Sequence, residues 1–87
     1  MKRYHKNEEI ETVEMADELG MLNIKTGLYY VLDSIGVEIW SMLEQPNDIN
    51  SIVLALQKEY DVNHLNCKEG VEALIFSMKD KGLILEV

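Results

Sequence analysis

The stretch GLYYVLDSIGVEIWSML, residues 27–43, decides the fold, because an apolar strand pattern passes directly into an apolar helix pattern. Residues 28–32 are aromatic, branched or large, the types that suit a pleated strand. Asp33 and Ser34 can cap a helix, and from Ile35 the apolar period becomes helical. This segment therefore predicts one sheet strand followed by the first helix of the core.

Two shorter strand patterns precede this stretch. Residues 10–16, IETVEMA, alternate in polarity, and residues 21–25, MLNIK, form a second candidate strand after a turn at residues 17–20. Only Thr26 and Gly27 remain to reverse the chain before residue 28. We therefore expect an antiparallel hairpin between residues 21–25 and 28–32.

The two ends of the chain are less patterned. Residues 1–9 are polar and carry no periodicity, so we expect a flexible N-terminal arm before a single domain at residues 10–87. Residues 83–87 form a short apolar tail that can close the core or pair with a strand edge.

Helical patterns fill the rest of the chain. The first helix should end near Gln45, because Pro46 disfavours a helical conformation at the residue before it. Asn47 or Asp48 can cap a second helix, whose apolar face extends to Tyr60. Three short strands followed by three helices predict an α+β fold, a three-stranded antiparallel sheet with helices on one face, as in winged-helix domains.

The third helix is expected from Asn66, with Glu69 completing a capping box, to Lys81. Its main apolar stripe consists of Cys67, Val71, Leu74, Ile75 and Met78. Phe76 lies off this stripe and either packs on the C-terminal tail or lines an exposed groove. Gly36, in the first helix, either permits a close approach of another backbone element or lies so near the cap that its cost is small.

Composition and charge limit the class of protein. The chain has 87 residues, enough for one domain, and 47% hydrophobic residues, too many for a disordered chain. Three of the eight bases lie in the first six residues, which leaves five bases against sixteen acids, a net of −11, from residue 7 onward. Such a body disfavours nucleic acid and favours a cationic partner. We find no signal peptide or membrane span and expect a cytoplasmic protein.

Catalytic and metal-binding patterns are missing from the sequence. His5 and His64 lie far apart, and neither has a second metal ligand at a useful spacing. Cys67 could be a reactive thiolate at a helix N-terminus, but the interpretation we favour is a packing residue. The five glycines are scattered and form no phosphate-binding loop. We expect no cofactor and no enzymatic activity.

Three segments together resemble one known family. They are residues 20–45, GMLNIKTGLYYVLDSIGVEIWSMLEQ, residues 48–62 and residues 69–84. This order resembles the PqqD-like peptide chaperones, which recognise leaders in the modification of ribosomally made peptides. The family typically has Leu-Asn-x-x-Gly and then Ile-Trp. Residues 32–36, LDSIG, and 39–40, IW, match these motifs, with Asp in place of the usual Asn and Ile in place of the usual Thr.

The resemblance implies a winged-helix-like, non-catalytic adaptor that binds a precursor leader and presents it to modifying enzymes. The stretch GLYYVL before the motif is most similar to the stand-alone proteins of lasso-peptide clusters, which work beside a leader peptidase and a cyclase. The leader is expected to add as a strand beside residues 28–32 and to contact the third helix. The implied binding residues are Leu28, Tyr29, Tyr30, Val31, Leu32, Val71, Glu72, Ile75, Phe76 and Lys79.

Two questions stay open at this point. Tyr29 and Val31 share one face of their strand, and Leu28, Tyr30 and Leu32 share the other, and the sequence does not decide which face meets the leader. A free strand edge also allows either a monomer or a strand-exchanged dimer. The alternative function is a winged-helix DNA-binding regulator, which has the same elements but needs a basic recognition helix.

Overall fold

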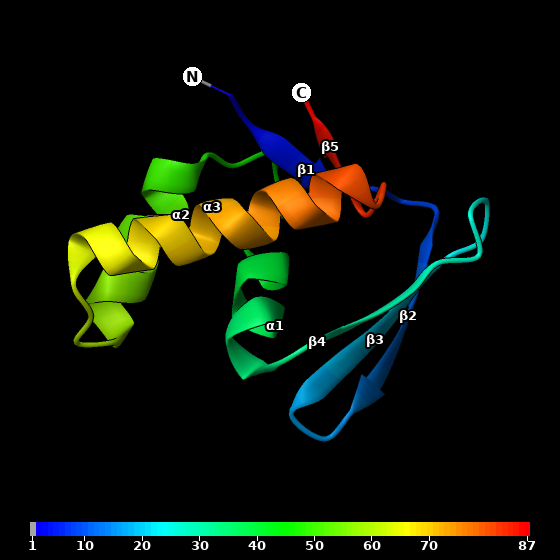
Figure 1. Cartoon of the computed structure of the whole chain (residues 1–87), viewed down its shortest axis with the longest axis horizontal. Coiled ribbons are helices and arrows are strands. Elements are labelled where there is room, and N and C mark those ends of the chain that lie inside the picture. The colour runs from blue at the N-terminus through cyan, green and yellow to red at the C-terminus, as the bar shows by residue number, and fades with distance from the viewer. Residues whose placement is uncertain (1) are drawn as a thin grey trace.

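A computed structural model describes residues 2–87 and gives three antiparallel strands followed by three helices, framed by a short strand at each end of the chain (Figure 1). In order, the elements are β1 Tyr4–Lys6, β2 Ile10–Met15, β3 Glu18–Asn23, β4 Tyr29–Leu32, α1 Ser34–Ser41, α2 Ile49–Glu59, α3 His64–Asp80 and β5 Ile84–Glu86. The predicted α+β class, with a three-stranded antiparallel sheet before three helices, is confirmed. None of the helices in this range has the length and apolarity that a membrane crossing requires.

The main sheet has the strand order β2-β3-β4, with both pairs antiparallel. The predicted hairpin is confirmed, but β3 begins at Glu18 rather than residue 21, and the turn before it is at Ala16, which has φ +54°. Gly20 suggested a turn in the sequence, yet it lies inside β3. The Tyr29 side chain covers it, and an added Cβ would collide with the Tyr29 hydroxyl. A glycine that makes room for a ring was therefore mistaken for a turn residue.

The N-terminal segment differs most from the prediction. Met1 lies outside the described residues, but Tyr4–Lys6 form β1, which pairs antiparallel with β5. Tyr4 is 2% exposed, and its N–H donates to the carbonyl of Asn47 over 2.7 Å. The expected flexible arm is therefore wrong for residues 4–6. The C-terminal tail does both things that were predicted, because Leu83 and Ile84 are buried and β5 pairs with a strand.

Side-chain caps fix the starts of all three helices. The Asp33 side chain accepts from the Gly36 N–H and that of Asp48 from the Ser51 N–H, as predicted for α1 and α2. The cap of α3 is Asn63 rather than the predicted Asn66, so this helix begins at His64. α1 ends at Ser41 rather than near Gln45. Asn63 and Asn66 are both suitable cap residues, and Pro46 sets only an upper limit on the end of α1.

Helix α1 begins very close to the end of β4. A Cβ on Gly36 would lie 3.0 Å from the Leu32 Cβ, so the space that this glycine leaves is taken by the Leu32 side chain rather than by another backbone element. The Asn47 side chain donates to the Met42 carbonyl just after α1, which holds the turn toward α2. The first contact limits the angle between the strand and the helix of the segment that decides the fold, and the second holds the chain beyond the helix.

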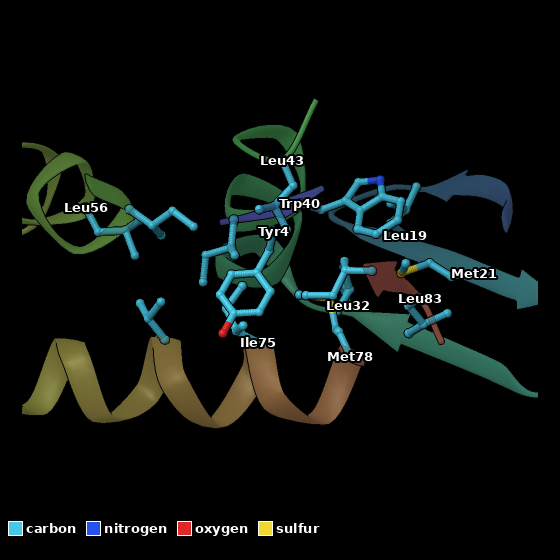
Figure 2. Close-up of a cluster of buried hydrophobic side chains, with 14 of the residues drawn as sticks. Tyr4, Leu19, Met21, Leu32, Trp40, Leu43, Leu56, Ile75, Met78 and Leu83 are labelled. Atoms are coloured by element: carbon cyan, nitrogen blue, oxygen red, sulfur yellow. The ribbon is translucent and has the colours of Figure 1, made fainter. Parts of the chain in front are cut away.

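The core lies between the sheet and the helices, and Figure 2 shows Leu32 of β4 and Met78 of α3 pointing toward each other within it. The predicted stripe of α3 is confirmed, with Val71, Ile75 and Met78 buried and Cys67 and Leu74 packed at its margin. This packing fixes the rotation of α3 about its axis. That rotation decides which of its flanks faces β4.

Candidate functional site

Strand β4 is an outer strand of its sheet. Within residues 2–87 it pairs only with β3. The Asn23 N–H donates to the Leu28 carbonyl over 2.9 Å, so by the alternation of an antiparallel ladder Tyr30 and Leu32 also bond to β3. The N–H and C=O groups of Tyr29 and Val31 therefore project to the free side. This edge presents two donors and two acceptors to a further strand.

The other edge, β2, is less suited to a new strand. The same alternation leaves the backbone groups of Thr12 on its free side. However, its sequence IETVEM places Glu11 and Glu14 along that edge. Charged side chains are a common means of blocking strand addition. The two edges of one sheet thus differ in side-chain character, and β4 is the more receptive.

The face of β4 that meets the helices carries Tyr30 and Leu32. Leu32 is buried, Tyr30 is half-buried, and the Lys81 Nζ lies 5.0 Å from the centre of the Tyr30 ring. Lys81 also donates to the Ser77 hydroxyl over 3.0 Å. This answers the question that the sequence left open: Tyr30 and Leu32 face the helices, and Tyr29 and Val31 face away.

A largely apolar pocket of about 480 Å³ opens at the end of β4. Its lining begins with Asp33 and Ile35, directly after the strand, and reaches Gly70 and Leu74 on α3. In the helix, Gly70, Leu74, Ser77 and Lys81 lie at spacings of four, three and four residues, so they share one face, which we call the β4-facing flank. The pocket begins directly after the free strand edge, at Asp33, and it shares Gly70 and Leu74 with the β4-facing flank.

The helix residues predicted for this site are divided between the core and two pockets. Val71 and Ile75 are buried in the core, and Val71 also lines the 480 Å³ pocket. Glu72 and Phe76 line a smaller pocket of about 230 Å³ with Tyr4 and Ile49. Lys79 is paired with Glu86 of β5, with 2.7 Å between the Lys79 Nζ and the Glu86 Oε1.

We call Glu72, Phe76 and Lys79 the β1-facing flank. Figure 1 shows α3 between the β1–β5 pair on one side and β4 on the other. The structure thus brings the predicted strand Leu28–Leu32 to the site but not these three helix residues. Of the two positions predicted for Phe76, packing on the C-terminal tail or lining an exposed groove, the structure shows the groove, and this groove lies beside β1.

Sequence reasoning missed Ile35, Gly70, Leu74, Ser77 and Lys81. Leu74 was assigned to the core stripe, and it is packed against the core but lies at its margin, beside the pocket. Phe76, an exposed apolar residue off the stripe, led the prediction to the β1-facing flank. A usable signal was Gly70, which leaves room on the flank where Leu74 stands.

The far wall of the pocket is fixed by a hydrogen bond between helices. The Tyr60 hydroxyl donates to the Glu38 Oε1 over 2.6 Å, and this bond raises the pKa of Tyr60 to about 12. Glu38 also raises the pKa of the Glu59 carboxyl, through a side-chain hydrogen bond and through charge repulsion. The other Glu38 oxygen, Oε2, is buried and accepts no hydrogen bond from the described residues.

The polar groups near the site do not form a catalytic arrangement. Cys67 lines the pocket, but the His5 ring bonds the Glu44 carbonyl and the His64 ring bonds the Gln57 side chain. Residues 2–87 contain no group of three or more side chains that could hold a metal ion. The arrangement offers backbone hydrogen bonds, apolar surface and one cation, Lys81, which suits the binding of an extended peptide.

Comparisons with known proteins agree with this geometry. The family model described as Coenzyme PQQ synthesis protein D (PqqD) matches residues 18–84. A solved structure of TbiB1 in complex with the TbiA(beta) leader peptide is 28% identical, with a TM-score of 0.82 over 92% of this chain and 93% of that chain.

A second solved structure, lasso peptide synthetase B1 complexed with the leader peptide, is 22% identical. Its TM-score is 0.81 over 94% of this chain and 96% of that one, and at this identity it supports the fold alone. No curated protein sequence matches the chain significantly. The family match covers most of the chain and confirms the resemblance seen in the sequence, so the chain belongs to the PqqD family.

Proposed function

We propose that this protein is a non-catalytic adaptor that binds the leader of a ribosomally made precursor peptide by strand addition along β4. It then presents the precursor to modifying enzymes, of which a lasso-peptide leader peptidase and a cyclase are the expected ones. The observation that carries the proposal is the free edge of β4 beside an apolar groove. The resemblance to TbiB1, a protein solved with its leader peptide, supports it.

Backbone bonds supply the part of the affinity that does not depend on the leader sequence. Tyr29 and Val31 offer up to four hydrogen bonds to an added strand, each worth about 0.5–1.5 kcal/mol net. An added strand requires no rearrangement of β3, because the backbone N–H and C=O groups of Tyr29 and Val31 already point away from β3. Peptide recognition at a sheet edge uses the same backbone groups in many domains.

Side chains supply the sequence preference. Every second side chain of the leader faces the β4-facing flank, where Tyr30 and Lys81 form one wall. The pocket beyond Asp33 accepts an apolar leader side chain between Ile35 and Leu74. Lys81, which is already held over Tyr30, favours an acidic leader residue at its end of the groove.

No observation favours the DNA-binding alternative. The helix that would enter a groove of DNA, α3, carries acids as well as bases. Its Lys79 is paired with Glu86, and Lys81 folds back onto Tyr30. A helix whose C-terminal cations are held in this way and which carries acids beside them offers little to a phosphate backbone.

Two proline variants test strand addition. Val31→Pro removes an N–H from the free edge of β4, and Thr12→Pro removes one from the free edge of β2, so both delete an edge donor from the same sheet. We expect a labelled synthetic leader, titrated by fluorescence anisotropy, to bind Val31→Pro at least about tenfold more weakly and Thr12→Pro like the wild type. Equal affinity of Val31→Pro and the wild type would contradict strand addition at β4.

Position 30 is not suitable for this test. Its N–H lies on the side of β4 that bonds to Met21 of β3, so a proline there breaks the sheet itself rather than its free edge.

A further inference from the structure

The outward face of the β2-β3-β4 sheet is covered by no element of residues 2–87. The helices pack on the other face, where Leu19, Met21 and Leu32 are buried (Figure 1). The strand register places Val13, Gly20 and Val31 in one row of the outward face. Glu11, Leu22 and Tyr29 form the next row.

This outward face is largely apolar, and its side chains contact one another. Val13 is 59% exposed, Leu22 38%, Tyr29 58% and Val31 42%. Tyr29 lies across Gly20, where a Cβ would collide with its hydroxyl and lie 3.1 Å from the Met15 side chain. The ring therefore bridges the strands and joins these side chains into one patch, which we call the outer patch. Contiguous exposed patches of this kind mark interaction sites.

Charge indicates the chemistry of the partner. The outward-facing residues of the three strands include Glu11 and Glu18 but no lysine or arginine. The chain as a whole has a formal net charge of −8. An apolar patch with acidic neighbours is complementary to an apolar surface bordered by basic side chains. A second copy of the same patch would bring acids against acids.

We propose that the outer patch is the docking surface for the leader peptidase, through an apolar surface of that enzyme bordered by lysine or arginine. This inference rests on the proposed function. A leader added beside β4 extends the sheet by one strand, so its alternate side chains lie on the same face as Tyr29 and Val31. The enzyme then contacts the outer patch and the leader together, and it binds the loaded adaptor more tightly than the empty one.

Reciprocal coupling follows from this arrangement. If the leader increases the affinity of the adaptor for the enzyme, the enzyme increases the affinity for the leader by the same factor. The edge of β4 and its outward face serve different partners. A substitution on β2 can therefore weaken enzyme binding without touching the leader site.

The test uses the purified full-length chain, a synthetic leader and the purified leader peptidase of the same organism. Val13→Lys introduces a charge into the outer patch, and Glu11→Lys reverses a charge on the same face. Leu54→Lys is the matched control, because Leu54 is 57% exposed but lies on α2, away from the sheet. Enzyme binding is measured by biolayer interferometry with and without leader, and leader binding separately by anisotropy.

We expect Val13→Lys and Glu11→Lys to weaken enzyme binding about tenfold, with Leu54→Lys unchanged. All three should bind the leader normally, and leader should tighten the wild-type enzyme complex. Wild-type affinity of both sheet variants, equal loss in the control, or no enzyme binding by the wild type would overturn the inference. So would a dimer in sedimentation that Val13→Lys dissolves, since a second copy would then occupy the patch. If the wild-type protein does not bind the leader, the proposed function is refuted instead.

Discussion

Truncation of Leu74 tests which flank of α3 meets the leader. Leu74→Ala removes three carbon atoms, worth about 2.4 kcal/mol if fully buried, at about 0.8 kcal/mol each. Leu74 is half-buried in the free protein, so the leader would newly cover about half of this surface. The expected loss is about 1.2 kcal/mol, which is about an eightfold increase in the Kd for the leader.

Phe76→Ala is the matched comparison. Phe76 stands two positions from Leu74 in the same helix and is 48% exposed, but it lies on the β1-facing flank. We expect its truncation to change the Kd by less than about twofold. The assay is a fluorescence anisotropy titration of a labelled leader, with urea denaturation to establish that both variants are folded. The reverse result, a loss with Phe76→Ala and none with Leu74→Ala, would refute the assignment and restore the flank expected from the sequence.

Two further predictions concern the fold around the site. Tyr4→Ala should lower the free energy of unfolding by about 3 kcal/mol, because a buried aromatic side chain is lost. Arg3→Ala, at an exposed position, should leave the free energy of unfolding unchanged. Equal urea midpoints for Tyr4→Ala and the wild type would favour the flexible N-terminal arm instead. One tyrosine should ionise with a pKa of about 12 in an ultraviolet titration, because Tyr60 donates to Glu38. Since this pKa is raised in the folded state, the bond stabilises the protein fully below about pH 10 and its contribution is lost as the pH rises toward 12. A Glu38→Gln variant that still shows the high pKa would contradict this cause.

The parts of the fold that sequence could predict are those set by local patterns. The strand at residues 28–32 and the helix after Asp33 follow from a change of apolar period within a few residues. The caps of α1 and α2 are predictable to within two neighbouring residues, because short polar side chains precede an apolar run in each case, and the structure selects Asp33 and Asp48.

The parts that sequence could not predict depend on distant contacts. Strands β1 and β5 are three residues each and lie at opposite ends of the chain, so neither has enough length to show a period. The burial of Tyr4 depends on Asn47 and β5, which no local pattern around residue 4 indicates.

The rotation of α3 had the largest consequence for the site. Apolar residues stand on both sides of its core stripe, with Leu74 on one flank and Phe76 on the other. Helical periodicity alone gives the stripe but not the identity of the element on each side. Only the position of Met78 facing Leu32 of β4 (Figure 2) and the packing of β5 along the opposite flank decide it.

Hydrogen exchange of individual amides, followed by NMR spectroscopy with and without saturating leader, tests strand addition most directly. Tyr29 and Val31 have amides on the free edge of β4, whereas the amide of Tyr30 already bonds to β3. We predict that the leader slows exchange at Tyr29 and Val31, with little change at Thr12 on the opposite edge of the sheet. Unchanged exchange at Tyr29 and Val31, or protection at Thr12 instead, would contradict strand addition along β4.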